Sequence, residues 1–195
     1  MKRNLRLLLV GVSLVAAVET ARPAKPDQKA REYVSPDSGA KVVVAPVGKE
    51  QGRSEYESRI EFWYSGDKLS CALDYSSDDS EHGFGVVKAE WTPDSRYFVF
   101  SLTSSGGHQA WHSPTQFFDR KDGTVRTLDD YFVGEVTNAN FRLVAPNTVK
   151  TEIWEGKPFP VSVKLAALPP LRSWRKSKPF LINCADGHIF KPDQP

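Results

Sequence analysis

The sequence predicts an all-β fold made of short antiparallel hairpins. Turn-forming clusters of Pro, Asp, Asn and Gly recur between segments that are either apolar or alternate between apolar and polar residues. Aromatic residues make up 11% of the chain, and together with β-branched residues they suit a pleated, half-buried surface. No long segment repeats apolar residues with the period of a helix. A β-sandwich is the alternative arrangement of the same strands.

The strands expected in the first half of the chain follow from these patterns. The Val-rich segment 41–45 comes after the turn sequence 35–39 (Ser-Pro-Asp-Ser-Gly), and the segment after it alternates, with Ile60 and Phe62 on one face. The turn at 65–67 joins that segment to the next one as a hairpin. The expected strands are Lys41–Ala45, Arg59–Tyr64, Lys68–Asp74 and Phe84–Trp91.

In the second half, the turn sequence 92–96 (Thr-Pro-Asp-Ser-Arg) precedes the aromatic and β-branched run Tyr97–Leu102, which predicts a mostly buried strand. Further along, Asp122-Gly123 suits a hairpin turn. A short helix is expected within 128–133, capped by Asp129 or Asp130, or near 165–168. The expected strands are Arg96–Thr103, Thr115–Asp119, Thr124–Leu128, Thr148–Trp154 and Val161–Leu165, with Ile189 and Phe190 closing a last hairpin.

A turn followed by a strand recurs three times. The sequences at 35–39, 92–96 and 145–148 (Ala-Pro-Asn-Thr) each precede a β-branched or aromatic run, and their prolines are 57 and 53 residues apart. These units resemble the turn-plus-strand units of TolB-like and WD40-like β-propeller blades, the third least closely because Asn147 replaces Asp. The resemblance covers only these units, and it implies partial propeller blades and a role mainly in protein contacts. Propellers usually close with at least four blades, so we expect a compact antiparallel domain with propeller-like hairpins.

The N-terminus has the features of an export signal. Lys2, Arg3 and Arg6 precede the uncharged apolar run Leu7–Val18, and Val15–Ala17 supplies small residues suited to signal peptidase. The run is short for a bilayer span, so we expect no stable membrane span after signal removal, with an uncleaved anchor as the alternative. The expected organisation is a signal peptide at 1–17, a flexible polar linker at 18–32, a single β domain at 33–191 and a tail at 192–195.

Without the signal the chain is close to neutral. The full chain has 26 Lys and Arg against 24 Asp and Glu, and residues 1–17 hold three of the basic residues and no acidic one, which leaves a net charge of −1. This balance argues against a nucleic-acid binder, which needs a concentrated basic face. The basic cluster Arg172–Lys178 suits either a solvated loop or a contact with acidic envelope polymer or phosphate.

The two cysteines, Cys71 and Cys184, are far apart in an apparently exported chain. This placement favours a disulfide that ties the segment Phe180–Cys184 back to the strand Lys68–Asp74. Two buried free thiols are the alternative interpretation. A catalytic cysteine is the weakest interpretation, because neither residue lies in a recognisable nucleophile sequence.

The loop Ser104–Pro114 is the best candidate for a binding site. It contains His108, Trp111 and His112, and loops on a rigid scaffold commonly carry function. The spacing of the two histidines would suit a metal pair on a helix, but Gly106, Gly107 and Pro114 argue against a helix. We therefore expect ligand or partner contacts through His108, Trp111 and His112, with a structural loop whose Trp111 plugs the core as the alternative.

The acidic loop 74–83 is the second candidate. Its side chains Asp74, Asp78, Asp79, Glu81 and His82 offer weak ligands for Ca²⁺, which accepts flexible oxygen cages. The spacing does not match an EF-hand, so the simpler interpretation is a solvated acidic turn.

The chain contains no catalytic signature. It has no Gly-x-Ser-x-Gly elbow and no Gly-rich phosphate loop, and no cofactor is expected. We therefore expect a periplasmic or secreted, non-catalytic binding or protein-interaction domain whose partner is another envelope or extracellular protein or polymer. Two alternatives stay open: a small metal- or carboxylate-dependent hydrolase acting on envelope polymer, and a structural accessory module.

Overall fold

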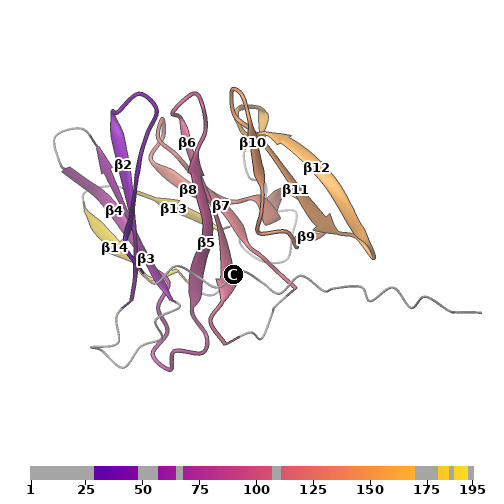
Figure 1. Cartoon of the computed structure of the whole chain (residues 1–195), viewed down its shortest axis with the longest axis horizontal. Coiled ribbons are helices and arrows are strands. Elements are labelled where there is room, and N and C mark those ends of the chain that lie inside the picture. Colours follow the sequence, from indigo (N-terminus) through magenta and orange to yellow (C-terminus); the bar gives the residue numbers. More distant parts are fainter. Residues whose placement is uncertain are drawn as a thin grey trace, which may run out of the picture.

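The structure is a computed structural model that describes residues 29–47, 57–64, 68–106, 111–169, 180–184 and 187–192. It confirms the all-β prediction (Figure 1). The predicted signal peptide, most of the predicted linker and the basic cluster at 172–178 lie outside the described residues. The elements are β1 (Arg31–Val34), β2 (Ala40–Pro46), β3 (Ser58–Tyr64), β4 (Lys68–Asp74), β5 (Phe84–Trp91), β6 (Tyr97–Ser104), β7 (Thr115–Asp119), β8 (Thr124–Thr127), the 3-10 helix η2 (Leu128–Tyr131), β9 (Glu135–Val136), β10 (Arg142–Val144), β11 (Thr148–Trp154), β12 (Pro158–Lys164), the 3-10 helix η3 (Leu165–Ala167), β13 (Leu181–Asn183) and β14 (His188–Phe190).

The strands form three sheets that lie side by side in sequence order (Figure 1). The first sheet has the order β1-β2-β3-β4-β14, and the second has the order β13-β8-β7-β6-β5. The third has the order β10-β11-β12, with β9 also paired to β11. Each sheet is therefore an antiparallel meander, to which the C-terminal strands β13 and β14 are added at the edges of the second and first sheets.

The second sheet is the middle layer, and both of its faces are buried. In β6, Phe98, Phe100 and Leu102 belong to the core shared with the first sheet, whereas Tyr97 and Val99 belong to the core shared with the third sheet. Alternate residues of one strand thus enter two different cores, which explains why this run is almost continuously apolar. The facing residues include Val42, Val44, Ile60, Phe62 and Leu73 of the first sheet, and Val136, Val149, Ile153 and Val163 of the third.

The first and second of the repeated turns have the same internal hydrogen bonds. Ser35 Oγ donates to Asp37 Oδ1, and Thr92 Oγ1 donates to Asp94 Oδ1, each at 2.6 Å. In each turn the same hydroxyl accepts the N–H of the residue five positions further on, at 3.0 Å. The fourth residue of each turn is a serine with positive φ, 58° and 60°. The sequence repeat is therefore also a repeat of local structure.

The three repeated turns are also bonded to one another. Asp37 N–H donates to Ser95 Oγ at 3.0 Å, and Asp94 N–H donates to Pro146 O at 3.3 Å. The side-chain amide of Asn147 donates to Asp94 Oδ2 at 2.5 Å. These turns connect β1 to β2, β5 to β6 and β10 to β11. The bonds thus join equivalent points of the three sheets in a row.

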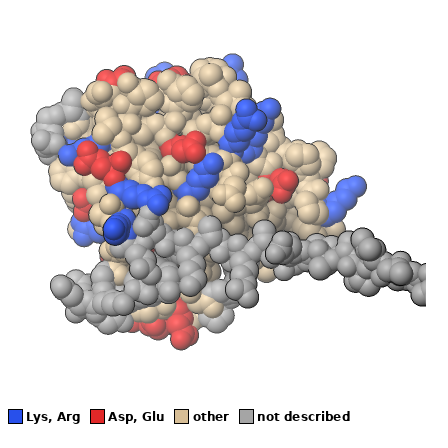
Figure 2. Space-filling view, in the orientation of Figure 1, with Lys and Arg blue, Asp and Glu red and all other residues tan. Residues whose placement is uncertain are grey.

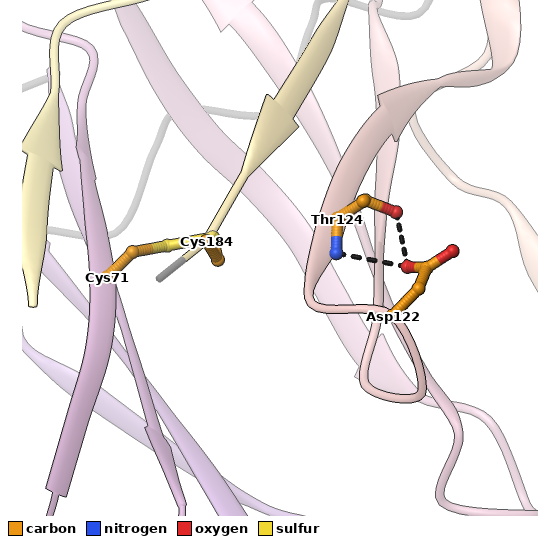
Figure 3. The surroundings of a disulfide bond; sticks show 4 residues. All are labelled: Cys71, Asp122, Thr124 and Cys184. Atoms are coloured by element: carbon orange, nitrogen blue, oxygen red, sulfur yellow. Dashed lines mark hydrogen bonds between the residues drawn. A yellow bond between two sulfur atoms is a disulfide. The ribbon is translucent and has the colours of Figure 1, made fainter. Parts of the chain in front are cut away.

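The C-terminal segment ties the first two sheets together. β13 pairs with β8 and β14 pairs with β4, and between them Cys184 forms the predicted disulfide with Cys71 (Figure 3). The N–H of Cys184 also donates to Gly123 O in the β7–β8 turn, which Asp122 closes by accepting from Thr124 (Figure 3). The crosslink spans 113 residues, a separation at which the chain-entropy model gives about 4–5 kcal/mol of stabilisation.

Some details differ from the sequence-based expectations. Strand β1 begins at Arg31, two residues before the expected start of the domain at 33. Ile189 and Phe190 do not close a hairpin, because β14 pairs in parallel with β4. The short helices expected after 128 and 165 are present as η2 and η3. In the described part of the chain, no helix is long and apolar enough to cross a membrane.

Candidate functional site

Trp111 lies at the molecular surface, at the start of the segment that leads into β7. Its side chain is 56% exposed, and its ring stacks on the ring of His112, with centroids 5.9 Å apart and planes inclined by 29°. The alternative expectation, that Trp111 plugs the core, is therefore wrong. His108, the third predicted binding residue, lies outside the described residues.

His112 is buried, and a buried carboxylate holds its ring. The Nε2 atom lies 3.0 Å from Asp129 Oδ1, and both residues are less than one tenth exposed. The rigid base on which Trp111 stacks is thus a hydrogen-bonded imidazole rather than an apolar side chain.

Asp129 has a different role from the one expected. It does not cap η2, whose N-cap residue Thr127 makes no side-chain capping bond. Instead, Asp129 accepts the N–H of Val136 at 2.9 Å, the hydroxyl of Thr127 at 3.1 Å and the N–H of Thr115 at 3.3 Å, in addition to His112. A buried carboxylate is tolerated only with such partners. The carboxylate therefore joins the second sheet to β9 beneath Trp111.

Several exposed apolar side chains lie close to β9. Ser113, two residues after Trp111, donates its N–H to Val136 O at 2.8 Å. Val133, 80% exposed, lies just before β9. Trp154 is 49% exposed and pairs with Glu135 of β9. Phe159 is 50% exposed and pairs with Ile153, the β11 residue that also pairs with Val136. Ile153 is next to Trp154 in β11, so Phe159 and Trp154 lie on opposite faces of the third sheet. Exposed apolar residues of this kind are frequent at interaction sites.

The acidic loop borders an open cleft of about 650 Å³. The cleft is lined by Tyr75–Asp79, by His82 and Phe84, and by Lys191 and Pro192 from the C-terminal segment. Lys191 Nζ lies 2.9 Å from Asp78 Oδ1, so an ion pair connects the two walls.

Figure 2 shows acidic and basic side chains interspersed over the face in view, rather than gathered into large areas of one sign.

Within the loop, Asp79 holds His82. Asp79 Oδ1 accepts the N–H groups of Glu81 and His82 at 3.0 and 3.1 Å, and its other oxygen contacts Nδ1 of the His82 ring. The bond from the Glu81 N–H, followed by the bond to the His82 ring, lowers the pKa of Asp79 well below its ordinary value. Asp79 is thus an ionised partner that orients the imidazole at the cleft.

The predicted metal ligands are not assembled into a metal site. Asp74 accepts the N–H of Ser76, Asp78 pairs with Lys191, and Asp79 pairs with His82. In the part of the chain that the structure describes, no group of three or more His, Cys, Asp or Glu side chains is placed to hold a metal ion.

Glu57 anchors the acidic loop, a role that no local sequence pattern predicts. Its side chain is fully buried. The carboxylate accepts the N–H and the hydroxyl of Ser77 at 2.9 and 2.6 Å, the N–H of Gly83 at 3.0 Å and the hydroxyl of Ser105 at 2.9 Å. A Cβ atom at Gly83 would lie 2.2 Å from Glu57 Oε1, so the close approach requires glycine. The donors are distant in sequence, and no local pattern reveals them.

Comparisons with protein-family models, with curated proteins and with solved structures found no match for this chain.

Proposed function

We propose that this protein is an exported, non-catalytic binding domain that contacts another protein through the surface around Trp111. The observation that carries the proposal is the exposure of Trp111, 56%, on a ring that is itself buried and bonded to Asp129. Tryptophan is strongly enriched among the residues that dominate binding energy at protein interfaces. A ring that is already held in place loses little side-chain entropy when a partner packs on it.

The exposed residues near β9 support a protein as the partner. Val133, just before β9, and Trp154, which pairs with Glu135 of β9, are further exposed apolar side chains near the strand to which Ser113 bonds. A single exposed ring suits stacking on one sugar, whereas several apolar side chains with polar neighbours suit the core and rim of a protein interface.

The export part of the proposal has two supports. The sequence of residues 1–17 predicts a signal peptide, and Cys71 and Cys184 form a disulfide, which persists mainly in oxidising compartments. We place the protein in the periplasm or outside the cell, where its partner is another envelope or extracellular protein or polymer.

We also propose that the three sheets are propeller-like units. The support is that the repeated turns occupy the same position in each sheet and bond to one another. The resemblance to TolB-like and WD40-like units implies a function mainly in protein contacts, in agreement with the proposed role of Trp111.

The test compares Trp111→Ala with Ile189→Ala as baits for partners from the native envelope fraction. Ile189 is a matched control, because its side chain is 57% exposed and it lies on β14, in the first sheet. Both substitutions remove an exposed apolar group, so each should change the free energy of unfolding by less than about 1 kcal/mol. Mass spectrometry of the captured proteins should show a stoichiometric partner that only Trp111→Ala loses.

The opposite pattern is equally informative. If both variants retain the same stoichiometric partner, or if only Ile189→Ala loses it, the surface around Trp111 is not the contact. If Trp111→Ala unfolds at much lower denaturant than Ile189→Ala, the exposed tryptophan has a structural role that its exposure does not indicate.

The cleft supports a second candidate, a carboxylate-dependent hydrolase that acts on envelope polymer. The specific observation is that Asp79 orients His82 at an open cleft. A carboxylate-bound imidazole is a common general base. Release of soluble fragments from peptidoglycan should then fall at least about tenfold in Asp79→Asn and in His82→Gln, while Trp111→Ala retains it. Absence of any fragment release by the parent chain, with and without chelator, would remove this candidate.

A further inference from the structure

Among the described residues, no strand continues the third sheet beyond its third meander strand, whereas a fourth meander strand continues each of the other two sheets. The repeated turns lie between β1 and β2, between β5 and β6, and between β10 and β11, so β3, β7 and β12 are equivalent third strands. β3 pairs with β4, and β7 pairs with β8. In the described ranges, no strand pairs with the side of β12 that faces away from β11. β12 therefore ends its sheet where the other two sheets continue.

Two prolines determine which main-chain groups face this open edge. Pro158 and Pro160 have no N–H, so the hydrogen bonds from β12 to β11 are made by the residues that alternate with these prolines along the strand. The β11 residue opposite Pro160 is Glu152, and its carbonyl accepts a hydrogen bond on the side of β11 that faces away from β12. Glu152 and Pro160 are therefore a pair that exchanges no hydrogen bonds, as the missing N–H of Pro160 requires. The N–H groups of Ser162 and Lys164 consequently point to the open edge. The first half of the edge has no donor, and the second half has two.

Short strands already add to the edges of the other two sheets, where the disulfide between them helps to hold them. β13 adds to β8 over Leu181–Asn183, and β14 adds to β4 over His188–Phe190, three residues in each case. The second half of the β12 edge, from the Pro160 carbonyl to Lys164, offers a ladder of the same length. The two prolines thus shorten this edge without closing it.

The outer face of the third sheet carries three basic side chains that are not neutralised. Arg142 lies directly opposite Lys150, and Lys164 is at the end of β12; all three are exposed. None of the three forms an ion pair with a described residue. Like charges directly opposite each other on two strands are destabilising. The same face also carries Glu152 and Glu135, so the uncompensated positive charge is local to the Arg142–Lys150 pair and to Lys164, where an anionic partner would relieve it.

The outer face of the first sheet shows what the compensated arrangement looks like. There, Lys41 Nζ lies 4.0 Å from Glu32, and Arg59 lies 3.0 Å from Glu61. Lys41 also lies over the Trp63 ring, 5.7 Å from its centroid. Among the residues that the structure describes, the two end faces of the stack thus differ: Lys41 and Arg59 are paired on the first sheet, whereas Arg142, Lys150 and Lys164 form no ion pair on the third.

We propose that the third sheet binds an extended acidic segment of a partner polypeptide, which pairs antiparallel with the second half of β12. The partner's main chain would bond to Ser162 and Lys164, in the way that strands add to exposed sheet edges. Its acidic side chains would lie on the outer face beside Lys164 and within the field of Lys150 and Arg142. The residue between them would lie opposite Val163, whose side chain belongs to the core between the second and third sheets.

Two other occupants fit the edge less well. A second copy of this chain would place its own Lys164 and prolines against the same groups, so the pairing would lose bonds and add repulsion. A polyanion such as polyphosphate could neutralise the three cations but would not use the N–H groups of the edge. The proposal is independent of the proposed function, because it uses no contact of Trp111.

The test uses the fluorescein-labelled peptide Glu-Val-Glu-Val-Glu and the full chain, with binding followed by anisotropy. In the proposed pairing the glutamate N–H groups bond to β12 and the valine N–H groups point away. The peptide N-methylated at its glutamates should therefore bind at least about tenfold more weakly, whereas the peptide N-methylated at its valines should bind as the parent does. Lys164→Glu should weaken binding by a similar factor, while Lys41→Glu and Trp111→Ala should leave it within about twofold.

Because the decisive comparison is between two peptides, it does not depend on how any variant folds. Absence of binding at about 1 mM peptide, or equal binding of the two methylated peptides, overturns the proposal. Equal binding together with displacement by polyphosphate would assign the face to a polyanion instead. A dimer in sedimentation equilibrium that the peptide does not dissociate would assign the edge to a second copy.

Discussion

The second and third sheets are meanders of the same design, yet they present opposite patterns to water. In β6 of the second sheet six consecutive residues are buried, whereas buried and more exposed residues alternate in β11 of the third. The difference follows from position, because the described residues cover the second sheet on both faces and the third on one. The same repeated turn thus introduces a continuous apolar strand in one layer and an alternating strand in the other.

The largest expected effect concerns the middle layer. Phe98 is fully buried and lies against Phe62 and Trp91, at centroid distances of 6.3 and 5.3 Å. Phe98→Ala should reduce the free energy of unfolding by about 3–5 kcal/mol, through lost burial and the cavity that remains. Trp154→Ala, on the outer face of the third sheet, should cost less than about 1 kcal/mol. Equal costs in urea unfolding would contradict the assignment of the second sheet as the doubly covered layer.

Removing the disulfide should have the next largest effect. The double variant Cys71→Ala, Cys184→Ala should lose about 2–5 kcal/mol of stability, mainly because the unfolded chain gains freedom. β13 and β14 flank Cys184 and pair over three residues each, so their amides should lose hydrogen-exchange protection first. The third sheet receives no strand from this segment, and β10–β12 should keep their protection under mild conditions. Simultaneous loss in both regions would show that the three sheets open as one unit.

How much the sequence predicts also depends on the region. The long strands and the repeated turns could be predicted, since their apolar pattern and turn residues are local. β9, β10 and β13 could not, because strands of two or three residues exist only through their tertiary pairing. At the candidate site, the sequence identified Trp111 and His112 but not the exposure of one or the burial of the other. Glu57 and Asp129 acquire their roles from donors that are distant along the chain.

A smaller effect is expected in the row of turns that joins the sheets. Hydrogen bonds from the Ser35 hydroxyl, then from the Gly39 N–H and from Arg120, lower the pKa of Asp37 to about 2. The lowered pKa means that the contribution of Asp37 to stability is complete above its unfolded value and is lost as the pH falls toward 2. An NMR titration of the Asp37 carboxyl should show this pKa, and Ser35→Ala should raise it toward the ordinary value. An unchanged pKa in that variant would mean that Ser35 is not the main partner.

The smallest change in stability is expected at the edge of the third sheet, where Pro158→Thr together with Pro160→Thr adds two donors. The change in unfolding free energy should stay within about 1 kcal/mol, because both residues are exposed and neither N–H is needed within the sheet. The longer edge should, however, promote association between copies, most clearly at high salt, where the repulsion between lysines is screened. Sedimentation velocity at increasing concentration should detect dimers of this variant, while Ser162→Thr, which adds no donor, stays monomeric. A double variant that remains monomeric at high salt would show that the prolines do not protect this edge, and that the third sheet ends for a reason other than its main chain.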